Sequence, residues 1–196
     1  MKEFQCKCCG DCCSGDMEIF LNLYDLYKIA KHRGYTSTKT LFDNRIVSIA
    51  KGQNSMLFPR MVFKKYPYKF CPFLINDVDE KMNIRGFCSL HPYTKPLVCI
   101  LAPHSKIYDN DSKESKYIYT KPTESCPGKL ADFENSNKQI LDPILLELAY
   151  DNDFFNILSL IKDKNIQNYE SKLYYFSTKR AFKDTMLQLR SYYEKA

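Results

Sequence analysis

The feature that most constrains this chain is a run of cysteines near its start, FQCKCCGDCC. It places Cys6, Cys9, Cys12 and Cys13 in a CxxCxxCC pattern, with Cys8 as an additional cysteine inside the run. A cysteine at every third residue lets a tight loop turn several thiolates towards one point, and soft thiolates are the ligands that zinc and iron–sulfur clusters prefer. The run therefore predicts a metal-binding loop onto which the rest of the chain folds.

Four further cysteines lie downstream, and two of them stand directly before proline. A remote Cys-Pro ligand that completes such a loop is known from iron–sulfur proteins. We expect eight cysteines to act as ligands and Cys8 to be the spare one. The expected ligands are Cys6, Cys9, Cys12, Cys13, Cys71, Cys88, Cys99 and Cys126.

Metal binding is favoured over disulfide formation. Met1-Lys2-Glu3-Phe4 leads straight into the cysteines, which predicts no signal peptide and a cytoplasmic protein. Thiols are kept reduced in that compartment. A disulfide contributes about 2–4 kcal/mol, whereas a structural zinc site contributes about 10–16 kcal/mol. A loop as open as residues 1–18 needs the larger contribution.

The spacing favours an iron–sulfur cluster, with 4Fe-4S as the first choice and zinc as the alternative. The CxxCxxC triplet with remote Cys-Pro residues resembles cluster-binding runs more than the paired CxxC motifs of zinc ribbons. The adjacent pair Cys12 and Cys13 is also awkward for a closed tetrahedral zinc site. His91 and His104 lie in the cysteine region, but each stands beside a proline in a loop, where a structural role is more common.

The composition limits the partners. The net charge of +6 is a mild excess, which favours anionic partners without indicating nucleic acid, and we expect no nucleic acid as a partner. No stretch approaches the roughly 18 apolar residues of a membrane helix, so we expect no membrane partner either. A protein substrate or a redox partner is the remaining expectation.

The N-terminal half predicts two helices. Asn22 is a candidate N-cap with Asp25 in the capping-box position, and Gly34 is the expected stop. A second helix is expected from Ser37 to about Gly52.

The middle of the chain predicts strands and loops. Residues 56–70 are expected to be extended, with Pro59 at an edge or a bend. Residues 71–75 and 86–90 are expected to form a hairpin that brings Cys71 and Cys88 side by side. A stiff loop at 91–96, a short buried run at 97–101, and short strands at 107–108 and 117–119 follow.

The C-terminal part is expected to be helical. Asp142-Pro143 is a helix start signal, and the stretch 144–161 follows it, with a break expected near 151–153. A last helix carries Phe182, Met186, Leu189 and Tyr193 on one stripe, with basic residues around it. We interpret those basic residues as the solvated face of a core-packing helix rather than as a site for an acidic partner or nucleic acid.

These elements predict an α+β fold, mostly helical, with small β-hairpins and irregular loops around a cysteine-ligated metal site and a C-terminal helical cap. We expect a cysteine-rich domain over 1–129 and a helical segment over 130–196 packed on it as one compact domain.

The ordered set of motifs resembles the CxxCxxCC family of zinc- or iron-chelating proteins, called YkgJ-like, which includes the flagellin lysine N-methylases. The resemblance covers residues 4–128. It is carried by the N-terminal run, the leucine-rich helix with Asp25, Cys71-Pro72-Phe73-Leu74, Cys88, the segment Lys95-Pro96-Leu97-Val98-Cys99, and Cys126-Pro127-Gly128. The family usually has arginine where Lys95 stands, and commonly another where Ile100 stands, so an anion-binding role of those arginines does not transfer to this chain.

The resemblance implies an oxygen-sensitive metal site, which in the methylases is used near S-adenosylmethionine. It leaves three functions open: a protein-lysine N-methyltransferase, a redox or electron-transfer protein, and a zinc-stabilised interaction module without catalysis. No GxGxxG loop is present, so S-adenosylmethionine would bind elsewhere, against the metal site.

Overall fold

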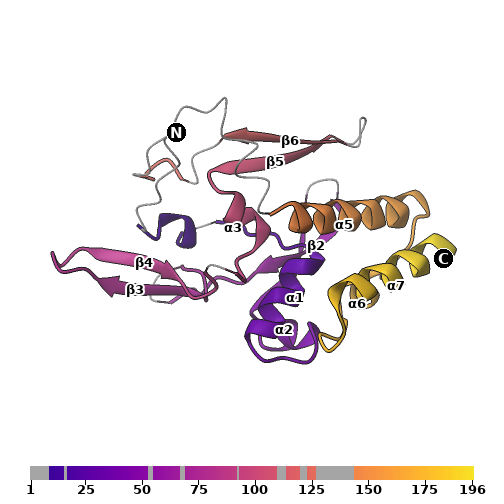
Figure 1. Ribbon diagram of the computed structural model, residues 1–196, viewed down its shortest axis with the longest axis horizontal. Coiled ribbons are helices and arrows are strands. Elements are labelled where there is room, and N and C mark those ends of the chain that lie inside the picture. Colours follow the sequence, from indigo (N-terminus) through magenta and orange to yellow (C-terminus); the bar gives the residue numbers. More distant parts are fainter. Residues whose placement is uncertain are drawn as a thin grey trace. The chain divides into compact units, whose positions relative to one another are not determined.

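The computed structural model describes residues 9–15, 17–52, 55–66, 69–91, 93–109, 114–119, 123–126 and 144–196. In these residues helix exceeds strand, and the strands form three separate two-stranded antiparallel sheets (Figure 1). The α+β class, the small hairpins and the C-terminal helix are therefore as predicted. No helix in the described ranges is both long and apolar enough to cross a membrane.

The chain divides into two compact units, each built from two separate segments. Unit 1 contains residues 1–19 and 63–145, and unit 2 contains residues 20–62 and 146–196. The helices that follow residue 145 thus belong with residues 20–62. The predicted boundary between residues 129 and 130 lies in 127–143, outside the described residues, as does the start signal Asp142-Pro143.

Helix α1 (Leu23–His32) opens unit 2 and has the predicted ends. The side chain of Asn22 accepts a 2.8 Å hydrogen bond from the Asp25 amide, and the Asp25 carboxylate accepts one of 3.2 Å from the Asn22 amide, which is a complete capping box. Gly34 adopts a φ of +72°, the left-handed conformation in which a helix commonly stops.

The second predicted helix is correct only at its start. Helix α2 covers Lys39–Asp43, and the chain then turns into strand β1 (Val47–Lys51). Arg45 has a φ of +53°, which ends helical geometry, and the branched residues that follow suit a strand better than a helix. Strand β2 (Leu57–Met61) pairs with β1 and places Pro59 opposite Ile49, so the extended conformation predicted there is confirmed.

The C-terminal part of unit 2 contains three helices: α5 (Leu145–Asp163), α6 (Glu170–Tyr174) and α7 (Phe182–Lys195). Helix α5 continues through residues 151–153, where a break was expected. The predicted stripe of α7 is buried as expected. Helix α6 has only five residues, which is too short for a helical period to show in the sequence. Tyr174 and Tyr193 are fully buried and fill space in a core that contains no tryptophan.

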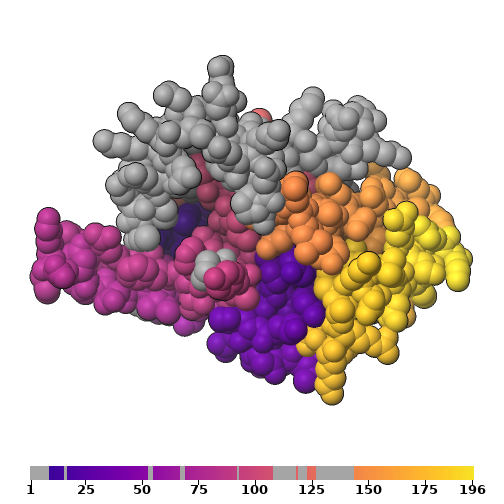
Figure 2. Space-filling model, in the orientation of Figure 1, coloured from indigo at the N-terminus to yellow at the C-terminus, as the bar shows by residue number. Residues whose placement is uncertain are grey.

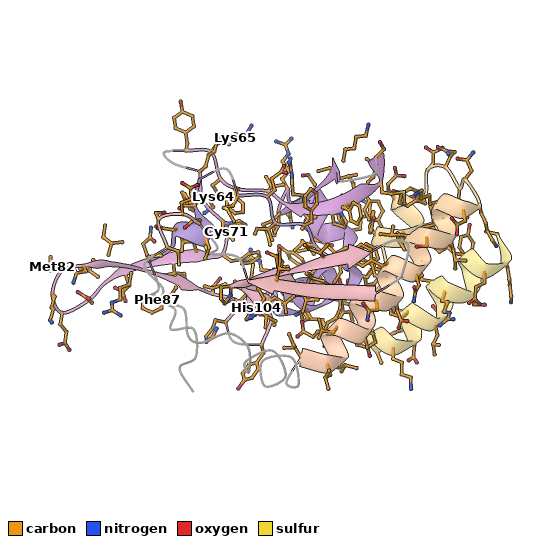
Figure 3. The ribbon with its side chains drawn as sticks, turned by 90° about the horizontal axis from the view of Figure 1, so that it is seen from above. Lys64, Lys65, Cys71, Met82, Phe87 and His104 are labelled. Atoms are coloured by element: carbon orange, nitrogen blue, oxygen red, sulfur yellow. The ribbon has the colours of Figure 1, made fainter. Side chains whose placement is uncertain are left out.

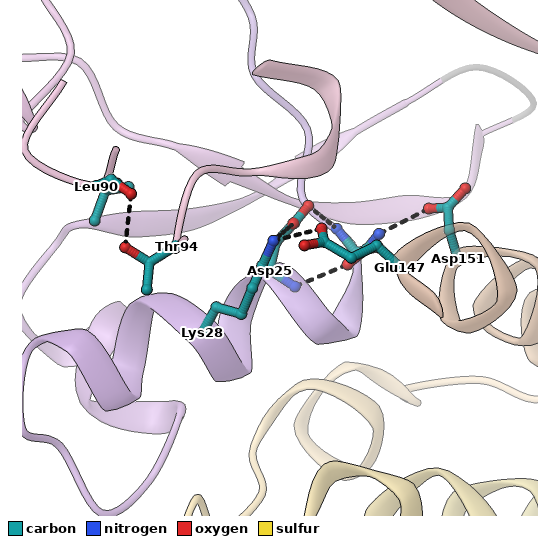
Figure 4. Close-up of polar contacts among 7 residues, drawn as sticks. Asp25, Lys28, Leu90, Thr94, Glu147 and Asp151 are labelled. Atoms are coloured by element: carbon teal, nitrogen blue, oxygen red, sulfur yellow. Dashed lines mark hydrogen bonds and ion pairs between the residues drawn. The ribbon is translucent and has the colours of Figure 1, made fainter. Parts of the chain in front are cut away.

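A buried polar network joins α1 to α5 (Figure 4). The Lys28 ammonium lies 2.6 Å from a Glu147 carboxylate oxygen and 3.6 Å from that of Asp25, and only 6% of the Lys28 side chain is exposed. The Asn22 side-chain amide donates a 2.8 Å hydrogen bond to Asp151. This hydrogen bond gives the buried Asp151 carboxylate a donor in the middle of α5.

Unit 1 contains the cysteines. A 3₁₀ turn, η1 (Asp11–Cys13), is followed by the hairpin β3 (Leu74–Val78) and β4 (Ile84–Cys88), helix α3 (Leu97–Leu101), and the hairpin β5 (His104–Asp109) and β6 (Glu114–Tyr119). The predicted hairpin is present, and the short strands expected at 107–108 and 117–119 are parts of a second hairpin, β5–β6. The buried run at 97–101 is a helix. The β3–β4 hairpin projects from unit 1 (Figure 2) and exposes apolar side chains, among them Met82 at its turn (Figure 3).

Candidate metal centre

The N-terminal cysteines are presented by a tight turn. Gly10 has a φ of +79°, a left-handed conformation that suits glycine, and its carbonyl oxygen accepts a 2.8 Å hydrogen bond from the Cys13 amide. The turn leaves the Sγ atoms of Cys12 and Cys13 3.8 Å apart. Two thiolates bound to one tetrahedral ion with bonds of about 2.3 Å are also about 3.8 Å apart.

Backbone hydrogen bonds bring Cys71 next to this turn. The Cys71 amide donates to the Cys13 carbonyl oxygen at 2.7 Å, and the Gly15 amide donates to that of Lys69 at 2.9 Å. Phe70 pairs as an isolated antiparallel bridge with Ser14 and also with Lys64. Cys71, which is labelled in Figure 3, therefore lies beside the turn of the N-terminal cysteines, although it is 58 positions after Cys13 in the sequence.

The β3–β4 hairpin lies against the same turn through two glycines. A Cβ atom at Gly86 would lie 2.6 Å from the Cα atom of Gly10, which is backbone and cannot swing aside. Cys88 pairs with Leu74 in the hairpin register, and the Leu74 amide donates to the Cys71 carbonyl oxygen. The predicted approach of Cys71 and Cys88 thus follows from a hairpin that begins three residues after Cys71.

The remaining ligand candidates lie on two other segments. Cys99 is in α3, whose residues Leu97 and Leu101 are buried, and Cys126 lies in the short described segment 123–126. Cys6 and Cys8 lie outside the described residues. The seven described cysteines all belong to unit 1, none forms a disulfide, and all are half-buried.

The pKa values show which thiols interact. The hydrogen bond from Cys13 lowers the pKa of Cys12 to about 6 against the effect of burial, and the positive charge of Lys95 lowers it further. The same contact, together with burial, holds the pKa of Cys13 above its ordinary value, and the charges of Cys71 and Cys99 add to this effect.

Two further thiols extend this set of interactions. Burial raises the pKa of Cys71 to about 11, and the charges of Cys88 and Cys12 contribute to the increase. Burial also raises the pKa of Cys9, with contributions from Asp11, Cys126 and Cys12. Each described cysteine is thus within electrostatic range of at least one other.

The donor chemistry and the Cys12–Cys13 spacing fit a thiolate-ligated metal, but the described residues do not assemble a complete ligand set. In the part of the chain that the structure describes, no three His, Cys, Asp or Glu side chains are arranged to hold a metal ion. His104 is buried with its Nδ1 atom 3.3 Å from the Leu101 carbonyl oxygen, and His91 is exposed.

Sequence reasoning missed two residues of this region. Lys95 was read only as a departure from a family pattern, although it is a cation four residues before Cys99. Nothing in the sequence indicated that position 86 must be glycine, because the residue that leaves no room for a side chain there, Gly10, is 76 positions away.

Comparison with protein families, with curated proteins and with solved structures finds no match for this chain. The resemblance to the CxxCxxCC family therefore stays a prediction that rests on the motif residues themselves.

Proposed function

We propose that the chain binds a metal centre through cysteine thiolates of unit 1, with an iron–sulfur cluster as the first choice and zinc as the alternative. The 3.8 Å spacing of the Cys12 and Cys13 sulfur atoms carries this proposal, because two ligands of one metal atom have that separation. Further support comes from the backbone hydrogen bond that holds Cys71 beside Cys13.

No three of the described side chains are arranged to hold an ion, so metal binding would have to draw the sulfur atoms together. Cys12, Cys13 and Cys71 would then hold the centre, with Cys9, Cys88, Cys99 and Cys126 around them and Cys6 from the N-terminal run. When bound, the centre would supply a redox-active or a structural metal. Metal binding is the property that the three predicted functions share, since the methyltransferase, the electron-transfer protein and the interaction module would each need it.

The test is anaerobic purification followed by iron, sulfide and zinc analysis and a visible spectrum. A brown protein with iron and acid-labile sulfide supports the cluster, and a colourless protein with stoichiometric zinc supports the alternative. The variant C12S/C13S should lose the metal, whereas C8S, which alters the spare cysteine, should keep it. Wild-type protein that binds neither metal would overturn the proposal.

A further inference from the structure

The net positive charge of the chain comes from one of the two units. Unit 1 contains 14 Lys and Arg residues and 14 Asp and Glu residues, whereas unit 2 contains 15 and 9. The whole net charge of +6 therefore belongs to unit 2. The cysteine region contributes none of it.

Burial increases the excess at the surface of unit 2. Asp25 and Asp151 are buried, and Glu147 is mostly buried against Lys28. Once these four residues are set aside, 14 cations and six carboxylates remain at the surface of this unit. Two of the six carboxylates are already engaged, because Asp43 pairs with Lys39 and Glu194 pairs with Arg190.

Two segments that are distant in the sequence bring several of these cations together. Residues 177 and 37 form an antiparallel bridge, and the Thr178 amide donates a 3.0 Å hydrogen bond to the Thr36 carbonyl oxygen. The Tyr27 hydroxyl donates a 3.0 Å bond to the Arg180 carbonyl oxygen, and the Lys31 ammonium lies 5.3 Å from the centroid of the same Tyr27 ring. The end of α1 and the turn before α7 thus lie side by side.

We name the exposed cations of these two segments the basic patch: Lys31, Arg33, Lys179, Arg180 and Lys183. Over the described ranges, no carboxylate forms an ion pair with any of the five. Asp184 is the one acidic residue in segments 31–37 and 177–184. Like charges on two adjoining segments repel one another, and an anionic partner would relieve that repulsion.

From the sequence alone, the basic residues around the start of α7 are interpreted as a solvated face, but the structure adds the cations of the α1 end to them. We propose that the basic patch binds an acidic polypeptide segment, that is, a run of Asp or Glu side chains on a partner protein. The patch is compact, covering a helix end and one adjoining turn, so a short run of carboxylates would match it. A nucleic acid calls for phosphate contacts repeated along a track and exposed rings on which bases stack. The two rings beside the patch are half-buried, and their hydroxyls are bonded to Arg180 in the case of Tyr27 and to Asn44 in the case of Tyr35.

The experiment measures binding of a dye-labelled deca-glutamate peptide to the full chain by fluorescence anisotropy at low salt. A single-stranded deoxyoligonucleotide of equal charge and the same dye is measured in parallel. The variant K179E/R180E should bind the peptide about tenfold more weakly, a change of about 1.4 kcal/mol, since two favourable charge contacts become repulsive.

The matched control is K162E/K195E, which changes the net charge equally. Lys195 is at the opposite end of α7, about 20 Å from the patch at 1.5 Å per residue, and Lys162 is in the last turn of α5. The control should bind the peptide as the wild type does. An equal loss of peptide affinity in both variants would show a general charge effect and overturn the proposal that the basic patch is the binding site. Absence of peptide binding, or tighter binding of the oligonucleotide, would overturn the acidic-polypeptide assignment.

Discussion

The Cys71 amide donates a 2.7 Å hydrogen bond to the Cys13 carbonyl oxygen. This bond and the one from the Gly15 amide to the Lys69 carbonyl oxygen align the segment that contains Cys71 with the N-terminal turn. The positions of the candidate ligands therefore depend on the backbone of unit 1.

The substitution Gly86→Ala should destabilise unit 1. The new methyl group would lie 2.6 Å from the Gly10 Cα atom, so the hairpin and the cysteine turn would have to separate. Forced overpacking of this kind costs about 1–3 kcal/mol. Chemical denaturation should show this loss, and anaerobic metal analysis should show lower occupancy. Asn76→Ala, at the exposed position opposite Gly86, is the control. Equal stability of the two variants would contradict the close approach.

Removal of the proposed metal should affect unit 1 selectively. The metal would stabilise residues that it ligates, whereas the core of unit 2 contains no cysteine. Hydrogen exchange after chelation should therefore increase in β3, β4 and α3 and remain unchanged in α1 and α7. Equal loss of protection in both units would count against this division.

The thiols of Cys12 and Cys71 should differ in reactivity in the metal-free protein. The thiolate is the reactive form, so alkylation of Cys12 should rise through about pH 6 and then level off, whereas that of Cys71 should still be rising near pH 11. Site-resolved mass spectrometry with iodoacetamide measures both profiles.

Two substitutions test the causes of the low pKa of Cys12. Cys13→Ala removes its largest cause, the hydrogen bond, and should move the Cys12 midpoint up towards its ordinary value. Lys95→Met removes a smaller electrostatic contribution and should produce a smaller upward shift. A wild-type Cys12 midpoint already at the ordinary value would contradict the described contact.

The buried Lys28 should be far more important to stability than an exposed lysine in a similar pair. Lys28→Met leaves the carboxylates of Asp25 and Glu147 without their buried cation, and breaking such a pair costs about 3–5 kcal/mol. Lys39→Met, which breaks the exposed pair with Asp43, should cost less than about 1 kcal/mol. Urea denaturation of the two variants gives the comparison, and similar losses would show that the Lys28 network contributes little.

Local signals were predictable from the sequence, and distant partners were not. The capping box of α1 was found because Asn22 and Asp25 are three residues apart. The second helix was extended too far because Ile46 and Ile49 have helical spacing. The branched side chains of the same residues favour a strand, and the positive φ of Arg45 decides between the two. Lys28 meets Glu147 across 119 residues of sequence, a separation at which no local pattern operates.

The candidate site was predictable only in part, for the same reason. The spacing of the cysteines indicated which residues to consider, and the hairpin that brings Cys88 towards Cys71 followed from turn chemistry. Two features depend on how separate segments meet, which the spacing of the cysteines does not encode. They are the effect of Lys95 on the pKa of Cys12 and the close approach of Gly86 to Gly10.

Each unit is made of two separated segments, and this has a consequence for folding during synthesis. Unit 1 needs residues up to 145 and unit 2 needs residues up to 196, so neither can close while the first half of the chain leaves the ribosome. The cysteine run emerges before Cys71, Cys88, Cys99 and Cys126. A metal delivered during that interval would have to be held by the five cysteines of the run alone.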